Sequence, residues 1–211
     1  MGSQMSPASG DLLVATTNQG KVSELRELLP GIRLLTPADA GVQLEVEETG
    51  RTFSENARLK ACAYSEATGL RTIGEDSGIE IDALGGEPGV YSARYHGLPD
   101  GPVKNAHVLE LLGEVPEAER GCRYVCAIAL VSPGEREQIF EGECRGRIAS
   151  EPAGEGGFGY DPIFFVPRLG RTMAELSAAE KNGISHRGRA VQELARYLAA
   201  HDGVPSADPP P

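Results

Sequence analysis

The sequence lacks any apolar stretch that approaches the roughly 18 residues of a membrane span. Residues 1–10 contain neither an apolar nor a basic segment of the kind found in secretory signals, so the cytoplasm is the expected compartment. Cysteine is scarce, and no Cys-x-x-Cys pair occurs among Cys62, Cys122, Cys126 and Cys144. These cysteines are expected to be small buried thiols rather than the ligands of a zinc site.

Basic residues are in the minority. The chain has 20 Lys and Arg against 31 Asp and Glu, a formal net charge of −11, which disfavours nucleic acids and membrane surfaces as partners. A small anionic substrate is still allowed, provided that its charge meets a local cluster of Lys, Arg and backbone N–H groups, or a divalent metal. The length of 211 residues suits one large domain or two closely packed lobes.

The order of the predicted elements favours an α/β fold. Tails rich in Pro, Ser and Gly at residues 1–10 and 203–211 are expected to be disordered and to flank one domain, residues 11–202. A capping box of Thr52 and Glu55 and an N-cap at Ser185 mark two helix starts. This order predicts a mixed sheet flanked by helices. The expected strands are 12–15, 72–74, 79–83, 123–131 and 137–144, and the expected helices are 22–28, 52–68, 103–112, 173–180 and 186–200.

The first candidate segment is Thr16-Thr17-Asn18-Gln19-Gly20-Lys21, between a predicted buried strand and a helix. Anions bind at helix N-termini, where unpaired N–H groups and the positive end of the helix dipole meet. The segment is not a Walker A loop, because the first Gly is missing and Val22 stands where Ser or Thr would hold magnesium. The alternative is simply an N-capped helix after a tight turn.

The second candidate segment is Gly74-Glu75-Asp76-Ser77-Gly78, with Glu80 and Asp82 just beyond. Adjacent carboxylates in a Gly-bounded turn suit magnesium, and one of them could instead act as a general base. An acidic, well-solvated turn is the alternative. Glu45, Glu47 and Glu48 form a second acidic cluster, for which a solvated face is the usual explanation.

Two further segments have the chemistry of a base pocket. In Gly156-Gly157-Phe158-Gly159-Tyr160-Asp161, glycines allow close approach of the backbone, and the two aromatic rings could stack on a base. The segment from Lys181 through His186 and Arg187 to Arg189 is cationic at a helix start. The alternatives are a glycine-rich loop that leads into a buried strand and a solvated basic turn.

In this order, the segments resemble one family, the inosine/xanthosine triphosphate pyrophosphatases, or deaminated-purine NTP pyrophosphatases. The resemblance covers residues 11–200, and the run from Asp76 to Tyr95 is its most specific part. The matching stretches are Ala15-Thr16-Thr17-Asn18-Gln19-Gly20-Lys21, Glu48-Thr49-Gly50 with Phe53 and Glu55-Asn56-Ala57, Asp76-Ser77-Gly78 continued through Leu84-Gly85-Gly86-Glu87-Pro88-Gly89-Val90-Tyr91-Ser92-Ala93-Arg94-Tyr95, Gly157-Phe158-Gly159-Tyr160-Asp161-Pro162, and Ser185-His186-Arg187.

The resemblance implies an elongated mixed sheet with two lobes around a nucleotide-binding cleft, and a homodimer. It implies magnesium-dependent hydrolysis of ITP, dITP and XTP at the α–β phosphate bond, to the monophosphate and pyrophosphate, which would cleanse the nucleotide pool. Two other classes stay open: a pyrophosphatase for modified pyrimidine or standard nucleotides, and a catalytically silent nucleotide sensor. The sensor is disfavoured by Asp76, Lys21 and the acidic cluster, since a sensor needs no aligned base and metal.

The resemblance also implies roles for individual residues. Asp76 would be the magnesium ligand and proton acceptor, and Glu47 or Glu48 a second metal ligand. Many members carry Asp where Glu75 stands, so Glu75 is not expected to be a direct ligand. The substrate contacts would come from Thr16, Thr17, Asn18, Gln19, Gly20, Lys21 and Lys60 at the phosphates, from Ser77, from Phe158, Gly159, Tyr160 and Asp161 at the base, and from Lys181, His186 and Arg187.

Overall fold

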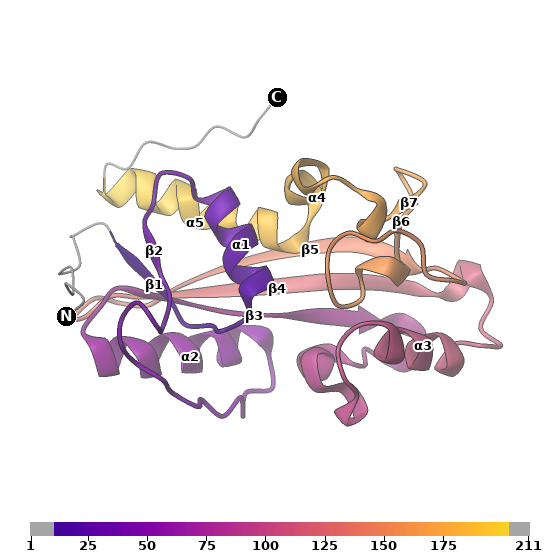
Figure 1. Ribbon diagram of the computed structural model, residues 1–211, viewed down its shortest axis with the longest axis horizontal. Helices are drawn as coiled ribbons and strands as arrows, with labels where there is room; N and C mark the ends of the chain where they lie inside the picture. Colours follow the sequence, from indigo (N-terminus) through magenta and orange to yellow (C-terminus); the bar gives the residue numbers. More distant parts are fainter. Residues whose placement is uncertain (1–10, 203–211) are drawn as a thin grey trace. The chain divides into compact units, whose positions relative to one another are not determined.

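The computed structural model describes residues 11–202, and both predicted tails lie outside the described residues (Figure 1). The strands are β1 (Leu12–Val14), β2 (Leu34–Leu35), β3 (Thr72–Ile81), β4 (Gly121–Val131), β5 (Gln138–Ile148), β6 (Phe164–Val166) and β7 (Arg171–Thr172). The α-helices are α1 (Gln19–Leu28), α2 (Phe53–Thr68), α3 (Pro102–Leu111), α4 (Ala178–Ile184) and α5 (His186–Asp202). Short 3-10 segments are η1 (Asp82–Leu84), η2 (Gly89–Gly97), η3 (Glu117–Glu119), η4 (Asp161–Ile163) and η5 (Met173–Glu175).

The strands form a seven-stranded sheet in the order β2-β1-β3-β4-β5-β6-β7. Strand β1 pairs in parallel with both β2 and β3, whereas β6 is antiparallel to both β5 and β7. The predicted mixed sheet flanked by helices is therefore confirmed. Within residues 11–202, no helix is both long and apolar enough to cross a membrane.

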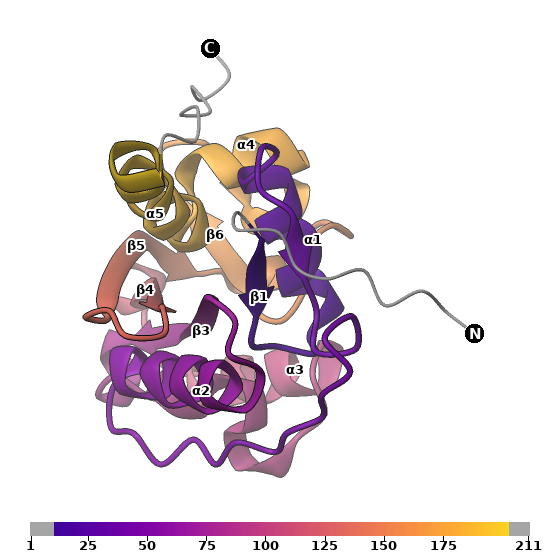
Figure 2. The ribbon, with the colours of Figure 1, turned by 90° about the vertical axis from the view of Figure 1, so that its left-hand side faces the viewer.

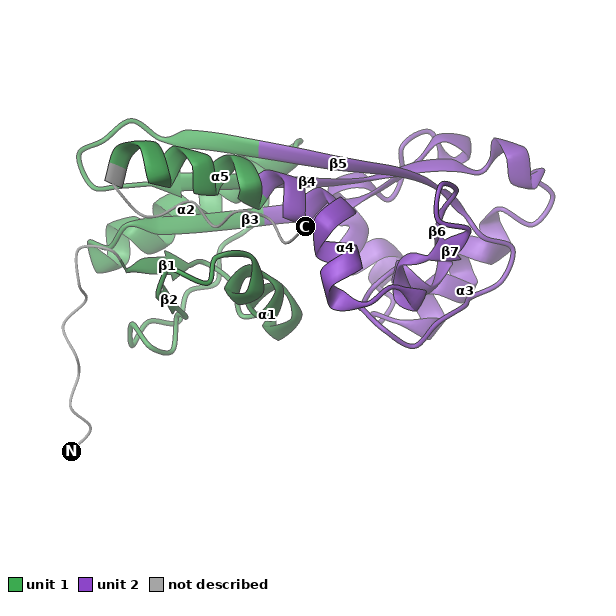
Figure 3. Ribbon diagram, turned by 90° about the horizontal axis from the view of Figure 1, so that it is seen from above, with its two compact units in different colours: residues 1–75, 128–140, 191–211 green, residues 76–127, 141–190 purple. Residues whose placement is uncertain are grey.

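The chain divides into two compact units (Figure 3). Unit 1 comprises the residues up to Glu75, Ile128–Phe140 and the residues from Val191 onward, and unit 2 comprises Asp76–Ala127 and Glu141–Ala190. In unit 1, α2 covers one face of the sheet while α1 and α5 lie over the other (Figures 1 and 2). Leu13, Ala15, Leu35 and Tyr64 form a core cluster in this unit. The larger cluster of unit 2 includes Ile79, Val108, Tyr124 and Phe164.

Side-chain caps explain where three of the helices begin. The capping box of α2 is confirmed, because the Glu55 N–H donates to Thr52 Oγ1 at 3.1 Å and the Thr52 N–H donates to Glu55 Oε2 at 3.3 Å. The predicted cap of α5 is confirmed too, since the Gly188 N–H donates to Ser185 Oγ at 3.0 Å. Asn18 caps α1 by accepting from the Lys21 N–H at 3.0 Å.

The stretch from Gly74 to Gly78 is not the predicted turn but the middle of the continuous strand β3. Its glycines are required by close packing rather than by chain reversal. A Cβ at Gly74 would lie 2.1 Å from the carbonyl oxygen of Ala57 in α2. A Cβ at Gly78 would lie 2.3 Å from Ser92 Oγ in η2. Glycine in a sequence is a turn signal, but a buried strand uses it equally where another backbone approaches closely.

The predicted helix 173–180 is also wrong in its bounds. The chain forms the 3-10 turn η5, becomes extended at Leu176, and starts α4 at Ala178. Two successive capping boxes, Thr172 with Glu175 and Ser177 with Glu180, each start a separate element. A single helix would have left the second box without a function.

Candidate functional site

The segment from Thr16 to Lys21 forms the link between β1 and the N-terminus of α1. Thr16 shapes the turn, because its Oγ1 accepts from the Asn18 N–H at 3.2 Å. Thr17, Asn18 and Gln19 are exposed, and Gly20 and Lys21 are half-buried. The positive end of a ten-residue helix dipole is thus placed beside short polar side chains that solvent can reach, an arrangement suited to an anion.

Lys21 is held by Glu75, a carboxylate that is not expected to bind the metal directly. Its Nζ lies 3.3 Å from Glu75 Oε1, and the side chains are 15% and 0% exposed, respectively. A buried carboxylate requires a partner of this kind. The pair fixes the ammonium group of Lys21 at the start of α1.

Lys60 and Glu48 form a second ion pair of unit 1, with 2.8 Å between Lys60 Nζ and Glu48 Oε1. Their side chains are 12% and 24% exposed, whereas Glu47 is exposed. The loop that carries these glutamates is anchored to α2, because the Gly50 N–H donates to Asn56 Oδ1 at 2.8 Å. Lys60 and Glu48 are therefore brought together by the structure rather than scattered on a solvated face.

Asp76 and Ser77 begin the part of β3 that belongs to unit 2. Asp76 is 6% exposed, so its carboxylate is almost fully removed from solvent. Successive side chains of a strand point to opposite faces, so Asp76 does not share a face with Glu75. Ser77 Oγ accepts from Arg187 Nη2 at 3.2 Å. Glu80, further along β3, is paired with Arg123 at 2.7 Å instead.

The predicted metal ligands are divided between the two units, with Glu47 and Glu48 in unit 1 and Asp76 in unit 2. Within the described part of the chain, no three His, Cys, Asp or Glu side chains are arranged to hold a metal ion. Magnesium does not require such a cage, because it usually takes one or two carboxylates and completes its shell with waters and substrate phosphates. The donor set of carboxylate oxygens fits magnesium.

Asp161 organises the glycine-rich loop of unit 2. Its Oδ2 accepts from the Phe158 N–H at 2.8 Å and from Lys181 Nζ at 2.7 Å, and its Oδ1 accepts from the Tyr124 hydroxyl at 3.2 Å. Burial, and secondarily the charge of Asp161, raises the pKa of Tyr124 well above its usual value, which keeps that hydroxyl a donor. The carboxylate thus ties the loop to β4 and α4.

Two cations lie close to the ring of Phe158. Lys181 Nζ is 4.7 Å and Arg187 Cζ is 5.5 Å from the centroid of its ring. The ring is half-buried, whereas that of Tyr160 is only 4% exposed and its hydroxyl donates to the Ser92 carbonyl at 2.9 Å. Of the two predicted stacking rings, Phe158 is the more accessible.

His186 and Arg187 lie at the start of α5 and are buried, at 5% and 1% exposed. The imidazole of His186 stacks on Tyr124, with 4.6 Å between the ring centroids, and Tyr124 stacks in turn on Phe164 at 4.4 Å. Tyr124 was missed by the sequence analysis, because its place in a β-strand gives no sign that it meets Asp161 and His186. Unit 2 therefore brings together Phe158, Asp161, Lys181, His186 and Arg187, and also Ser77 through Arg187.

A family model matches this arrangement of segments. The Ham1 family model aligns with residues 12–197, nearly the whole described part of the chain. The chain belongs to the Ham1 family. The match includes every residue that the sequence analysis proposed for the site, from Thr16 to Arg187.

Several proteins are similar to this chain over most of both sequences. A dITP/XTP pyrophosphatase of Gloeobacter violaceus is 55% identical over 87% of this chain and 91% of its own. A dITP/XTP pyrophosphatase of Thermus thermophilus is 47% identical over 92% and 93%. Among solved structures, the Ham1 protein of Staphylococcus aureus is 40% identical with a TM-score of 0.82, over 90% of this chain and 98% of its own.

Proposed function

We propose that this protein is a magnesium-dependent nucleoside-triphosphate pyrophosphatase that converts ITP, dITP and XTP to the monophosphate and pyrophosphate. The observation that carries the proposal is the 55% identity to a dITP/XTP pyrophosphatase over 87% of the chain. The chemistry of both units supports it, since unit 1 offers groups for phosphates and unit 2 offers groups for a purine.

The triphosphate would bind to Thr16–Lys21 and Lys60. Backbone N–H groups at the start of α1 and two lysines suit phosphate oxygens, because charge-assisted hydrogen bonds are stronger than neutral ones. Lys21 and Lys60 would stabilise the negative charge that develops on pyrophosphate as it leaves. Glu75 supports this role by fixing the ammonium group of Lys21 at 3.3 Å.

Asp76, with Glu47 or Glu48, would hold magnesium. When bound, the ion would supply countercharge to the phosphates and lower the pKa of a coordinated water. Asp76 would accept the proton of the attacking water.

The base would stack on Phe158, and its 6-keto oxygen would accept a hydrogen bond from Arg187 or His186. Adenine carries an amino donor at that position, so a buried donor of the protein would lose its partner. The position of Arg187 supports this role, because it is a buried donor whose Cζ lies 5.5 Å from the centroid of the Phe158 ring. Because the triphosphates of ITP and ATP are identical, discrimination must arise at this end.

The test is pyrophosphate release from ITP, dITP, XTP, GTP and ATP, with magnesium and with excess EDTA. The first three should react at least about 10- to 100-fold faster than ATP, the range that a lost buried hydrogen bond produces. GTP also has a 6-keto group, so its rate measures rejection of the 2-amino group. Equal rates on all five nucleotides, or full activity in EDTA, would overturn the proposal.

Two further expectations stay predictions: a homodimer in solution, which the resemblance implies, and action in the cytoplasm on the nucleotide pool. Light scattering coupled to size-exclusion chromatography measures the mass directly. A mass of about 22 kDa, the mass of one chain, would contradict the dimer.

A further inference from the structure

Helix α3 carries two neighbouring polar residues that are buried and that have no role in the proposed chemistry. Lys104 is 0% exposed and Asn105 is 2% exposed. Lysine is almost never fully buried unless it is paired, so its burial requires an explanation from its partners. Those partners lie in η2, at Asp100 just before α3, and in the loop that carries Phe158.

Lys104 joins η2 to Tyr160. Its Nζ donates to the carbonyl oxygens of Ser92 at 2.8 Å and Ala93 at 3.3 Å, and it lies 2.5 Å from Asp100 Oδ1. The same ammonium group is 5.0 Å from the centroid of the Tyr160 ring. The Tyr160 hydroxyl donates to the same Ser92 carbonyl at 2.9 Å. One buried cation therefore holds Tyr160, which follows Gly159 in the loop that carries Phe158, against η2.

Asn105 holds the residue between Phe158 and Tyr160. Its Nδ2 donates to the Gly159 carbonyl at 3.0 Å. Because a carbonyl oxygen can only accept, the orientation of this amide is fixed. Gly159 has a φ of 62°, a conformation that favours glycine, so the loop is tightly specified at this residue.

The other half of the Asn105 amide is not used. Its Oδ1 is buried and has no hydrogen-bond partner among the described residues. A buried polar atom left in this state costs free energy, and an apolar side chain of the same shape would avoid that cost only by leaving the Gly159 carbonyl without its donor. What Asn105 provides in return is the fixed position of Gly159.

We propose that Asn105, supported by Lys104, is a positioning residue for base recognition. It holds Gly159, and with it the neighbouring Phe158, close to Lys181 and Arg187. The inference rests on the proposed function, in which Phe158 is the surface on which the purine stacks. Asn105 itself touches neither base nor phosphate and acts through the loop.

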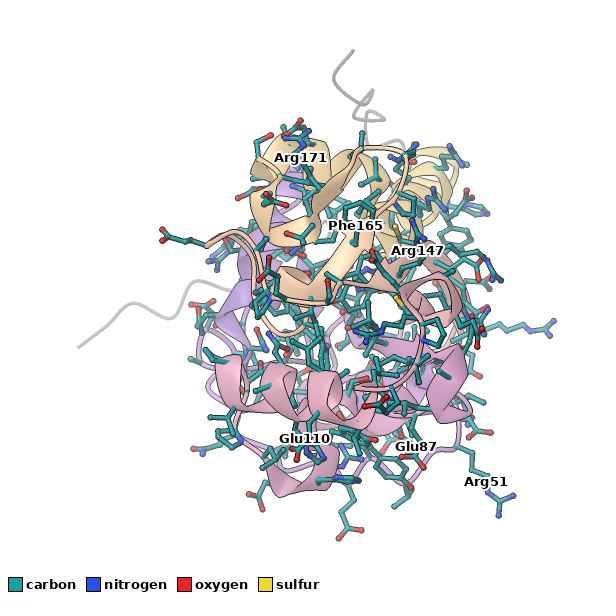
Figure 4. All side chains as sticks on the ribbon, turned by 90° about the vertical axis from the view of Figure 1, so that its right-hand side faces the viewer. Arg51, Glu87, Glu110, Arg147, Phe165 and Arg171 are labelled. Atoms are coloured by element: carbon teal, nitrogen blue, oxygen red, sulfur yellow. The ribbon has the colours of Figure 1, made fainter. Side chains whose placement is uncertain are left out.

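The test compares Asn105→Leu with a matched control, Glu110→Gln. Leucine keeps the approximate shape of asparagine and removes only the bond to Gly159. Glu110 lies on the same helix with its side chain 84% exposed (Figure 4). For Asn105→Leu, we expect the KM for ITP to rise about 10-fold with kcat within about twofold, since a loosened base pocket weakens ground state and transition state alike. The melting temperature should fall by only about 2–4 °C. Glu110→Gln should match the wild type in KM, kcat and melting temperature.

Hydrogen exchange of the peptide that covers residues 157–161 provides a readout that does not depend on activity. It should exchange faster in Asn105→Leu than in the wild type and the control. If the wild type releases no pyrophosphate, the proposed function fails, but faster exchange still supports the hold of Asn105 on the loop. Unchanged exchange, or an unchanged KM in an active enzyme, overturns the inference. Asn105→Ala takes the place of the leucine variant if the latter does not fold.

Discussion

Removing the ammonium group of Lys21 should affect stability as well as activity, because its partner Glu75 is 0% exposed in its side chain. At 3.3 Å and an effective dielectric constant of about 20, the Coulomb attraction of the pair is about 5 kcal/mol. Desolvation and side-chain ordering offset part of this, and we expect a coupling of about 1.5–3 kcal/mol. Lys21→Met alone should destabilise the protein by about 2–4 kcal/mol, because it leaves Glu75 buried without that charge.

The pair variant separates the two roles. Lys21→Met combined with Glu75→Gln should recover most of the lost stability, since replacing both partners of a buried pair is often close to neutral. It should not recover activity, because kcat/KM for ITP depends on the ammonium group itself. Loss of a charge-assisted phosphate contact predicts a fall of about 10- to 100-fold in both Lys21 variants.

Unit 1 contains a matched control in the ion pair of Arg58 and Glu137. The side chains of Arg58 and Glu137 are 56% and 37% exposed, and Arg58 Nε lies 2.6 Å from Glu137 Oε2. A double-mutant cycle with Arg58→Met and Glu137→Gln should give a coupling free energy of only about 0.2–1 kcal/mol. The kcat and KM of these control variants should equal those of the wild type. Urea denaturation and pyrophosphate release are measured on all variants. Equal coupling in both pairs, or recovery of activity in the pair variant, would refute the assignment of Lys21.

Three further predictions concern the reaction. Asp76→Asn should lower kcat by about 10²-fold or more while the protein stays folded by circular dichroism, and near-normal kcat would remove Asp76 from the mechanism. Arg187→Ala should reduce kcat/KM for ITP far more than for ATP if Arg187 donates to the 6-keto oxygen, whereas an equal reduction for both would place it at phosphate. Removal of magnesium by EDTA should abolish pyrophosphate release without altering the melting temperature by more than a degree or so, and a large fall in that temperature would indicate a structural metal instead.

Local signals in the sequence were sufficient to place most helices. The box of Thr52 and Glu55 and the cap at Ser185 are interactions over three residues, so their partners can be read directly from the chain. The helix predicted at 103–112 is found at Pro102–Leu111. The short strands β2 and β7 were not predicted, because two residues carry no periodicity.

Long-range pairing could not be predicted from one sequence. Gly74 and Gly78 resemble turn residues until the backbones that approach them are known. The site residues were found through their resemblance to a family, but their partners were not. Glu75 was not expected to bind the metal, and its partner Lys21 could not be predicted. Nothing near Tyr124 in the chain indicates that its hydroxyl contacts Asp161.

Charge balance explains how a chain of net charge −11 can present cations to a polyphosphate. The predicted lysines are each paired with a carboxylate, Lys21 with Glu75 at 3.3 Å, Lys60 with Glu48 at 2.8 Å and Lys181 with Asp161 at 2.7 Å. Pairing lowers the cost of holding these ammonium groups in largely buried places before a nucleotide arrives. It also means that a free triphosphate would meet carboxylates as well as cations. A triphosphate that carries magnesium brings its own countercharge, so the proposed magnesium requirement has an electrostatic reason in binding as well as in the chemical step.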